Sequence, residues 1–444
     1  MSASATAKVP RATSSRASLK KSSTKKVHVG AARRCLTPSP FGASLLWHAF
    51  QQVAAAHPHA VAVIDAERDW SWTTSQLLKE SAALAEILAA CAAASGDRIA
   101  FCLPNSADWL RLFLGMQRLG MTAVPLDPSL PRDAAVRLEA AHAAGAHWLW
   151  EAIHVTPGPN AETVPAYECE SYLQFRLVRT SNAVRKRVTA RQARPVLVKL
   201  TSGSTGVPKQ IPCTAGHMLA DGRNIISTME IRPDDINMAV IPLGHSYGLG
   251  NLVMPLLIQG TAVVVSREFV PRQLGFWIHR YRATVLPAVP AIFRALAVLS
   301  DPCLAPPLRL AISAGGPLSA AIRDAFAATH GIQIHNFYGS SESGGICYDR
   351  TGQAALAEGV AGAPLHGVRV SVSATGRIVV ESHAVAVGRQ APIRLSNSTE
   401  DTAPLDIKLR GEAAPANLYS IHIGDGLSHG RPKRYVLPDL GAWT

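Results

Sequence analysis

The sequence predicts an α/β protein in which mostly parallel β-sheets are flanked by helices, with a smaller β-rich part near the C-terminus. Three observations indicate this fold class. From about residue 41, short apolar runs typical of buried strands alternate with stretches of helical spacing. Loops rich in glycine and hydroxyl side chains follow several of these runs, as they do at strand ends in α/β sheets. Beyond about residue 365 the pattern changes to short strands, at 368–372 and 377–380.

The first helix and strands are predicted between residues 73 and 126. Residues 73–76 (TTSQ) fit a capping box. The apolar residues that follow recur at helical spacing: Leu77, Leu78, Leu84, Ala85 and Leu88. Residues 98–103 form a predicted strand, Asn105 is a suitable N-cap for a helix at 109–119, and a second strand lies at 123–126. This strand–helix–strand order favours a parallel sheet.

The same rhythm continues in the second half of the chain. Strands are predicted at 195–198, 238–242, 260–265, 283–287 and 310–313, and helices at 215–229 and from about Ser319. Residues 150–192 are less regular and carry no functional assignment.

Length and composition favour a soluble protein with a large core. The chain has 444 residues, of which 48% are hydrophobic, enough for more than one domain or subdomain. No apolar run reaches the length of a membrane span, and no signal-peptide pattern is present. The seven cysteines form no CxxC pair and no Cys/His cluster. We therefore expect reduced thiols and a cytoplasmic location.

The formal charge of +13 arises mostly at the N-terminus. Residues 1–40 hold nine basic side chains and no acidic one, so the other 35 basic residues face 31 acidic ones and carry +4. This segment has few large apolar residues, and we expect a disordered basic tail over 1–40. A transit peptide and a polyanion-binding arm are the alternatives. The small charge of the remainder makes nucleic acid a poor candidate partner for it.

The loop after the predicted strand at 195–198 is the most distinctive part of the sequence. Residues 201–209 read TSGSTGVPK, with four hydroxyl side chains, two glycines and one lysine. Glycines let backbone N–H groups approach an anion, hydroxyls donate hydrogen bonds, and lysine adds positive charge. A Walker A loop is excluded, because two residues separate Gly203 from Gly206 and Gln210 follows Lys209. From composition alone, a phosphate loop and a polar turn both remain open.

Two later segments carry groups suited to a nucleotide. After the strand at 310–313, Gly315 and Gly316 precede a helix, a junction that leaves backbone N–H groups open to a ligand. Residues 336–343 read NFYGSSES, in which Tyr338 offers a ring for a base to stack on. A hydroxyl beside a carboxylate, here Ser341 beside Glu342, suits a phosphate oxygen and a Mg²⁺ ion. The alternative for Glu342 is a solvated surface charge.

A histidine lies in the segment 241–248, which reads IPLGHSYG. An imidazole there could pack on a substrate and orient its carboxylate. The alternative is that His245 caps a loop.

Together these motifs resemble the adenylate-forming superfamily, which includes acyl-CoA synthetases, aryl-CoA ligases, luciferases and adenylation domains of peptide synthetases. The loop matches Thr-Ser-Gly-Ser-Thr-Gly-x-Pro-Lys, and YGSSE at 338–342 is similar to Tyr-Gly-x-Thr-Glu. Segments at 96–100, 103–106 and 120–126 follow the order of the superfamily's N-terminal region. The resemblance runs from about residue 41 to the end of the chain.

The resemblance implies an enzyme N-terminal domain that binds ATP, Mg²⁺ and a small carboxylic acid. It assigns the phosphates to the loop residues Thr201, Ser202, Gly203, Ser204, Thr205 and Gly206. It places the base and the rest of the nucleotide at Ala314, Gly315, Gly316, Asn336 and Tyr338, with Ser341 at the α-phosphate and Asp439 at the ribose. It gives catalytic roles to Lys209, to Glu342 as the magnesium ligand, and to His245 at the edge of the acid pocket.

The chain departs from the family pattern in a few places. Ser341 replaces a threonine and keeps its hydroxyl, Gln210 replaces a glycine, and Leu-Pro replaces Thr-Gly before Asp439. The family's small C-terminal domain, with its catalytic lysine, cannot be located. We expect a tail at 1–40, an α/β core at 41–365 and a β-rich subdomain at 366–444. Without the C-terminal domain, we expect adenylation to be reduced rather than abolished.

Three functions of different classes follow. The first is ATP-dependent activation of an acyl or aryl acid to an acyl-adenylate, for transfer to the thiol of CoA or an acyl carrier protein. The second is a nucleotide- or acyl-adenylate-binding protein with little activity alone, completed by a partner or a truncated form. Nucleic-acid binding through residues 1–40 ranks third. The sequence does not show which residues face the acid among Met218, Asn224, Tyr247, Leu249 and Phe337.

Overall fold

The computed structural model describes only part of the chain. The described residues are 42–91, 93, 95–152, 175–180, 194–201, 209–267, 269–299, 304–352, 361–373, 378–386 and 435–436. The predicted tail at 1–40, loop residues 202–208 and Asp439 lie outside them.

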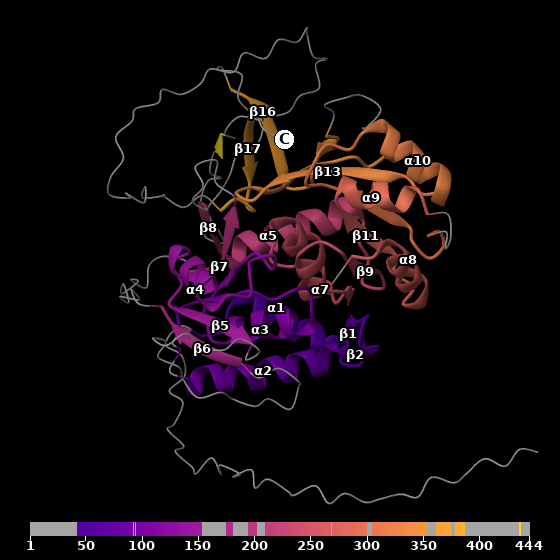
Figure 1. Ribbon diagram of the computed structural model, residues 1–444. Coiled ribbons are helices and arrows are strands. Elements are labelled where there is room, and N and C mark those ends of the chain that lie inside the picture. Colours follow the sequence, from indigo (N-terminus) through magenta and orange to yellow (C-terminus); the bar gives the residue numbers. More distant parts are fainter. Residues whose placement is uncertain are drawn as a thin grey trace, which may run out of the picture. The chain divides into compact units, whose positions relative to one another are not determined.

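Two large sheets form the framework of the described chain (Figure 1). The nine-stranded sheet has the order β15-β14-β13-β12-β11-β9-β10-β1-β2. Its strands are β1 (Val61–Asp65), β2 (Trp70–Thr73), β9 (Ile236–Ala239), β10 (Ala262–Val265), β11 (Val285–Ala288), β12 (Leu310–Ser313), β13 (Ile334–Ser340), β14 (Gly344–Tyr348) and β15 (Ala363–Pro364). Its central strands, from β1 to β13 in that order, run parallel, and β2, β14 and β15 pair antiparallel at the edges.

The six-stranded sheet repeats this plan, with the order β6-β5-β3-β4-β7-β8. Its strands are β3 (Arg98–Phe101), β4 (Thr122–Pro125), β5 (Trp148–Ala152), β6 (Phe175–Arg179), β7 (Pro195–Thr201) and β8 (Lys209–Thr214). The strands β5, β3, β4 and β7 are parallel, whereas β6 and β8 are antiparallel edge strands. Part of the segment 150–192, which looked irregular in the sequence, therefore supplies an edge of this sheet.

A small antiparallel sheet follows near the C-terminus, as predicted. Its strands are β16 (Val368–Val372), β17 (Ile378–Ser382) and β18 (Tyr435–Val436).

The helices supply the remaining layers. They are α1 (Leu45–Ala56), α2 (Thr74–Ala90), α3 (Ala107–Arg118), α4 (Ala134–Ala143), α5 (Ala215–Met229), α6 (Ser246–Gly248), the π-helix η1 (Leu249–Val253), α7 (Met254–Gln259), α8 (Pro271–Arg280), α9 (Pro290–Ala297) and α10 (Ala320–His330). No helix within the described ranges is both long enough and apolar enough to cross a membrane.

Local signals in the sequence predicted most helix starts correctly. The capping box at Thr73 and Gln76 is present, α5 has the predicted bounds, and Ser319 caps α10. The prediction that Asn105 caps the next helix was wrong. Ser106 is the N-cap of α3, and its hydroxyl accepts from the Trp109 backbone N–H at 3.2 Å. The side chain of Asn105 is engaged elsewhere, in the loop that carries His245.

Alternate residues of the strands enter different cores, because successive side chains of a strand point to opposite faces. In β10, Val263 and Val265 belong to a core between the two sheets, which α1, α2, α3, α5 and α7 fill. Val264 points to the other face of the nine-stranded sheet, under α8, α9 and α10. A third core covers the outer face of the six-stranded sheet under α4. The result is five layers, helix–sheet–helix–sheet–helix, with both faces of each sheet buried.

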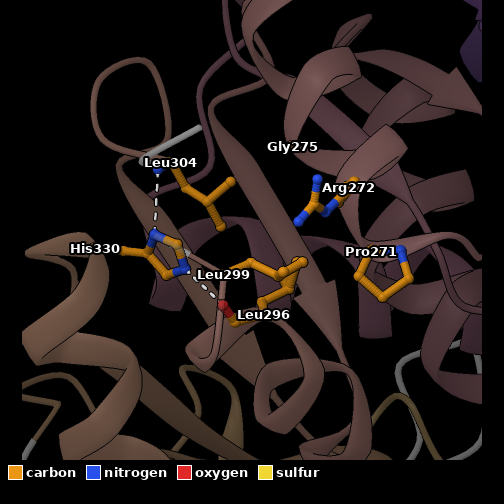
Figure 2. A pocket seen from close by; sticks show the side chains of 7 residues that line it. All are labelled: Pro271, Arg272, Gly275, Leu296, Leu299, Leu304 and His330. Atoms are coloured by element: carbon orange, nitrogen blue, oxygen red, sulfur yellow. Dashed lines mark hydrogen bonds between the residues drawn. The ribbon is translucent and has the colours of Figure 1, made fainter. Parts of the chain in front are cut away.

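A buried histidine ties α9 to α10 in the second core (Figure 2). The Nδ1 atom of His330 accepts from the Leu304 backbone N–H at 3.3 Å, so Nε2 carries the proton and donates to the Leu296 carbonyl at 3.0 Å. Burial lowers the pKa of His330, and the hydrogen bond to Leu296 opposes that shift. His330 lines a small recess with apolar neighbours and Arg272.

The first prediction concerns the core between the sheets. Phe113 is fully buried on α3 and stacks on Trp109, with ring centroids 5.3 Å apart. We expect Phe113→Ala to lower the free energy of unfolding by about 3–5 kcal/mol, because it removes a packed ring and leaves a cavity. Phe276 on α8 is 56% exposed, so Phe276→Ala should cost about 0.5 kcal/mol or less. Urea unfolding compares the two, and equal losses would contradict the placement of Phe113.

The second prediction concerns pH. The pKa of His330 is lowered below the value of about 6.5 expected in the unfolded chain, so neutral His330 stabilises the folded state above that pH. This stabilisation is lost as the pH falls through the folded-state pKa. We therefore expect the melting temperature to drop between about pH 7.5 and about pH 5 by less in His330→Gln than in the wild type.

Glutamine offers both a donor and an acceptor at this position but does not titrate. His279→Gln, which removes an exposed histidine of α8, serves as the control. The assignment of His330 is wrong if the His330→Gln and His279→Gln variants show the same pH dependence as the wild type.

Candidate functional site

Three of the predicted site segments meet at one edge of the nine-stranded sheet. His245 follows β9, Ala314–Gly316 follows β12, and Ser341 follows β13. These strands are parallel, so their carboxyl ends lie at the same edge. Ligands of open α/β sheets bind at such an edge, where loops replace the covering helices.

The six-stranded sheet contributes the hairpin of β7 and β8. Lys209, the first residue of β8, contacts Glu342 of the β13–β14 turn, with 2.7 Å between Nζ and Oε1. The lysine side chain is 34% exposed and the glutamate 16%, so this charge-assisted hydrogen bond is only partly screened by water. Thr201 faces Lys209 across the hairpin. The structure thus brings together two predicted site residues that lie 133 positions apart in the chain.

The turn that carries Ser341 and Glu342 is held from within. The Ser340 and Ser343 hydroxyls lie 2.7 Å apart, and Ser340 Oγ also accepts from the Ser343 backbone N–H at 3.1 Å. A Cβ atom on Gly339 would lie 2.6 Å from the Gly344 carbonyl oxygen, so the close approach of the two strands requires glycine there. The Glu342 carbonyl accepts from the Ala386 backbone N–H at 2.8 Å.

The amide of Asn105 holds the segment that leads to His245. Its Nδ2 donates to the carbonyl oxygens of Ala239 at 3.1 Å and Ile241 at 2.9 Å. Its Oδ1 accepts from the Leu243 backbone N–H at 2.9 Å. Sequence reasoning missed this role, because an asparagine just before a helix is also a good cap.

His245 caps the short helix α6, where its Nδ1 accepts from the Tyr247 backbone N–H at 3.4 Å. This is the alternative role that the sequence left open; the role at an acid pocket stays a prediction. The imidazole is exposed at the surface, yet the protein around it lowers the pKa of His245, and the positive charge of Lys199 lowers it further. His245 is therefore neutral at a higher fraction near neutral pH than an ordinary histidine.

The residues after His245 tie the three strand ends together. Ser246 Oγ donates to Ser341 Oγ at 2.9 Å. The buried Tyr247 donates its hydroxyl to the Ile312 carbonyl at 2.8 Å, and its ring lies 5.7 Å from that of Phe337. The π-helix η1 follows directly, a backbone irregularity that is frequent at functional sites.

The residues predicted to hold the base lie on β13 and after β12. Asn336 and Tyr338 are two positions apart on β13 and therefore share one face of the strand. Burial raises the pKa of Tyr338 to about 12, so its phenol is neutral at physiological pH. Gly315 has a φ of +79°, a left-handed conformation that favours glycine. The Ala314 backbone N–H donates to the Ala288 carbonyl at 3.2 Å.

The described residues contain no group of three or more His, Cys, Asp or Glu side chains that could hold a metal ion. Glu342 instead offers a single carboxylate beside the hydroxyl-bearing turn. Mg²⁺ is commonly bound by one or two carboxylates together with phosphate oxygens, so this donor set fits a metal that arrives with a nucleotide. The recess in Figure 2 shares none of the predicted site residues.

Two buried charged residues at this site were not singled out from the sequence. Lys199 of β7 is 4% exposed, and its Nζ donates to the Ser341 carbonyl at 3.4 Å. Asp221 of α5 is 2% exposed, and its Oδ1 accepts from the Gly345 backbone N–H at 2.9 Å. The signal for Lys199 was present as a charged residue inside the apolar strand VLVKL.

Curated proteins similar to this chain include acid–CoA ligases. The probable CoA ligase CCL5 of Humulus lupulus is 26% identical over 312 residues, which cover 66% of this chain and 56% of that protein. The medium-chain fatty-acid–CoA ligase of Escherichia coli (strain K12) is 26% identical over 314 residues, which cover 66% and 55%. The chain thus spans about half the length of the curated relatives it matches.

Solved structures share the fold. The N-terminal domain of FACL13 from Mycobacterium tuberculosis superposes with a TM-score of 0.62 at 21% identity, covering 77% of this chain and 89% of that one. The O-succinylbenzoate coenzyme A synthetase MenE from Bacillus subtilis, in complex with ATP and magnesium ion, gives 0.63 at 21% identity and covers 77% and 71%.

A family model matches the part of the sequence that contains these motifs. The model described as AMP-binding enzyme matches residues 50–386, which is well over half of the chain. The matched range contains the TSGSTGVPK loop, the segment of His245 and the turn of Glu342. The chain therefore belongs to the AMP-binding enzyme family, the adenylate-forming superfamily that its motifs resemble.

Proposed function

We propose that this protein uses ATP to convert a carboxylic acid, acyl or aryl, into an acyl-adenylate, and that the acyl group then passes to the thiol of CoA or a carrier protein. The observation that carries the proposal is the contact of Lys209 with Glu342, 2.7 Å long, at the carboxyl ends of the parallel strands. It joins the end of the TSGSTGVPK motif to the YGSSE motif. The CoA ligases among the relatives support the same reaction class.

The reaction needs alignment and charge neutralisation more than proton transfer. A carboxylate oxygen attacks the α-phosphorus, a new oxygen–phosphorus bond forms, and the bond to the bridging oxygen breaks. Pyrophosphate leaves with the electron pair of that bond. Both reactants are anions, so donors and positive charges fixed around them lower the barrier.

The site residues divide this work by position. The loop at 201–206 and Lys209 hold the phosphates, and the Ser341 hydroxyl donates to an α-phosphate oxygen. Glu342 would hold Mg²⁺, which when bound neutralises phosphate charge. The carboxylate of Glu342 keeps Lys209 directed toward the turn, because the two groups are in contact.

The nucleoside and the acid lie on either side of the phosphates in this proposal. Ala314–Gly316 with Asn336 and Tyr338 surround the adenine, and Asp439 accepts from the ribose hydroxyls. His245 orients the acid, and its lowered pKa favours the neutral imidazole, which can donate one hydrogen bond to a carboxylate.

The third prediction tests this function through acid-dependent ATP–pyrophosphate exchange, with acetate, octanoate, benzoate, 4-coumarate and the amino acids as the acid panel. We expect exchange with one acid class. Lys209→Ala and Glu342→Ala should each reduce it by about a hundredfold, since each removes a charge used at the phosphates. Lys79→Ala, which removes an exposed lysine of α2, should leave the rate unchanged.

The alternative outcome is ATP binding that depends on Glu342 with no exchange for any acid. It would refute the adenylation proposal and favour a nucleotide-binding protein that acts with a partner.

The fourth prediction concerns Asn105 as a positioning residue. Its amide makes three hydrogen bonds to the segment before His245, so Asn105→Ala should loosen the acid side of the site. We expect the KM for the acid to rise about tenfold, while the KM for ATP changes little. Steady-state exchange rates, measured at varied acid concentration and then at varied ATP concentration, give the two KM values separately.

Ser106→Ala is the matched control, because it removes the N-cap of α3 and leaves the loop contacts of Asn105 in place. It should lower stability by about 1 kcal/mol without changing either KM. If Asn105→Ala behaves in the same way, the amide of Asn105 serves only the fold.

A further inference from the structure

The β7–β8 hairpin presents two lysines on one face. Thr201 pairs with Lys209, Lys199 with Ile211, and Leu197 with Cys213 in the antiparallel register. Directly opposite residues of such a pair lie on the same face, as do residues two positions apart on one strand. Lys199 therefore shares its face with Lys209 and lies two residues further along β7 from the loop that connects the two strands.

These two lysines contact successive residues of the β13–β14 turn. Lys209 bonds to the carboxylate of Glu342, and Lys199 Nζ donates to the carbonyl of Ser341 at 3.4 Å. Their burial differs: the side chain of Lys209 is 34% exposed, whereas Lys199 is 4% exposed. The deeper lysine thus lies beside the residue assigned to the α-phosphate.

A buried ammonium group needs compensation, because its desolvation is costly unless an anion or several hydrogen bonds offset it. An ammonium has three donors, and the bond to Ser341 is at the long end of the accepted range. Of the carboxylate oxygens in the described part of the chain, none lies within 4.0 Å of Lys199 Nζ. The described residues around Lys199 therefore leave its ammonium group with donors that an anionic ligand could use.

Asp221 is a buried carboxylate that interacts electrostatically with Lys199. Burial raises the pKa of Asp221, and the charge of Lys199 and the hydrogen bond from Gly345 both oppose that shift. The carboxylate of Asp221 is directed to the glycines after the turn, since a Cβ on Gly344 would lie 2.3 Å from its Oδ1. Asp221 thus interacts with Lys199 at a distance and does not form a contact ion pair with it.

The positive charge of Lys199 also reaches the acid side of the site. It contributes to the lowered pKa of His245, after the larger effect of desolvation by the surrounding protein. Ser246, the residue after His245, bonds to the hydroxyl of Ser341 at 2.9 Å. Lys199 therefore contacts the residue assigned to the phosphate, and that residue is in turn bonded to the neighbour of His245.

We propose that Lys199 is a second cation of the site and binds an oxyanion beside Ser341, either the carboxylate of the acid or an α-phosphate oxygen of the nucleotide. The proposal rests on the proposed function, in which these two oxyanions must approach each other. A fixed ammonium at this position would reduce their repulsion and align them. It would act together with Lys209 and with the Ser341 hydroxyl.

The experiment compares the wild type with Lys199→Met and Lys199→Gln, which remove the charge with little change in length. Calorimetry measures the binding of AMP and of adenosine, and pyrophosphate exchange measures the KM for the acid that the wild type uses. Cys213→Ala is the control, because it trims a buried, uncharged side chain on the same hairpin face. Thermal unfolding identifies which of the two Lys199 variants is folded.

If the oxyanion is a phosphate oxygen, both variants should bind AMP about tenfold more weakly and adenosine as the wild type does. If it is the carboxylate, AMP binding should be unchanged and the KM for the acid should rise about tenfold, with kcat changed less. Cys213→Ala should alter none of these constants by more than about twofold.

Constants within about twofold of the wild type in a folded Lys199 variant would overturn the proposal and leave Lys199 as a structural partner of the Ser341 carbonyl. Failure of the proposed function gives a different result, namely a wild type without exchange. The AMP and adenosine affinities still decide the role of Lys199 in that case, because binding needs no turnover. A wild type that binds no AMP and shows no exchange would overturn both proposals.

Discussion

The burial of both faces of two β-sheets is the constraint on which the rest of this structure depends. Strands such as β10 are apolar on both sides, so each sheet must be covered twice. The five helices between the sheets serve both of them at once, and their side chains form the largest core. This shared layer fixes the two sheets relative to each other. As a result, the β7–β8 hairpin of one sheet can meet the β13–β14 turn of the other.

The candidate site lies where this covering stops. The parallel strands of the nine-stranded sheet end together, and short loops with several glycines and serines, and with His245, take the place of helices there. Gly315 adopts a left-handed backbone conformation that favours glycine, and Gly339 lets β13 and β14 approach each other more closely than a side chain would allow. Hydroxyl–hydroxyl contacts between Ser246 and Ser341 then link loops from different strands into one surface.

Charge is unevenly distributed at this site. Two lysines and one glutamate lie around the β13–β14 turn, and Asp221 lies behind it, among residues that are otherwise largely apolar. Burial strengthens the electrostatic effects of Lys199 and Asp221, because little water screens them. Desolvation by the surrounding protein, and then the charge of Lys199, lower the pKa of His245 and so favour it as a hydrogen-bonding group rather than a cation. A site of this kind suits a reaction between two anions.

Several features of this protein follow from the sequence alone. The α/β class, the bounds of α5 and β16, the capping box at Thr73 and the family all depend on local patterns, which neighbouring residues determine. Other features needed the tertiary structure. Asn105 looked like a helix cap, but its amide binds a segment more than 130 positions away, and no local pattern reveals such a partner. The edge strand β6 was missed. It pairs only with β5, and the sequence around it shows no alternation of strands and helices that would indicate a strand there. Lys199 contacts Ser341, which lies 142 positions later in the chain. Only the packing of the two sheets against the same helices brings these residues together, because electrostatic contacts depend on distance in space and not along the chain.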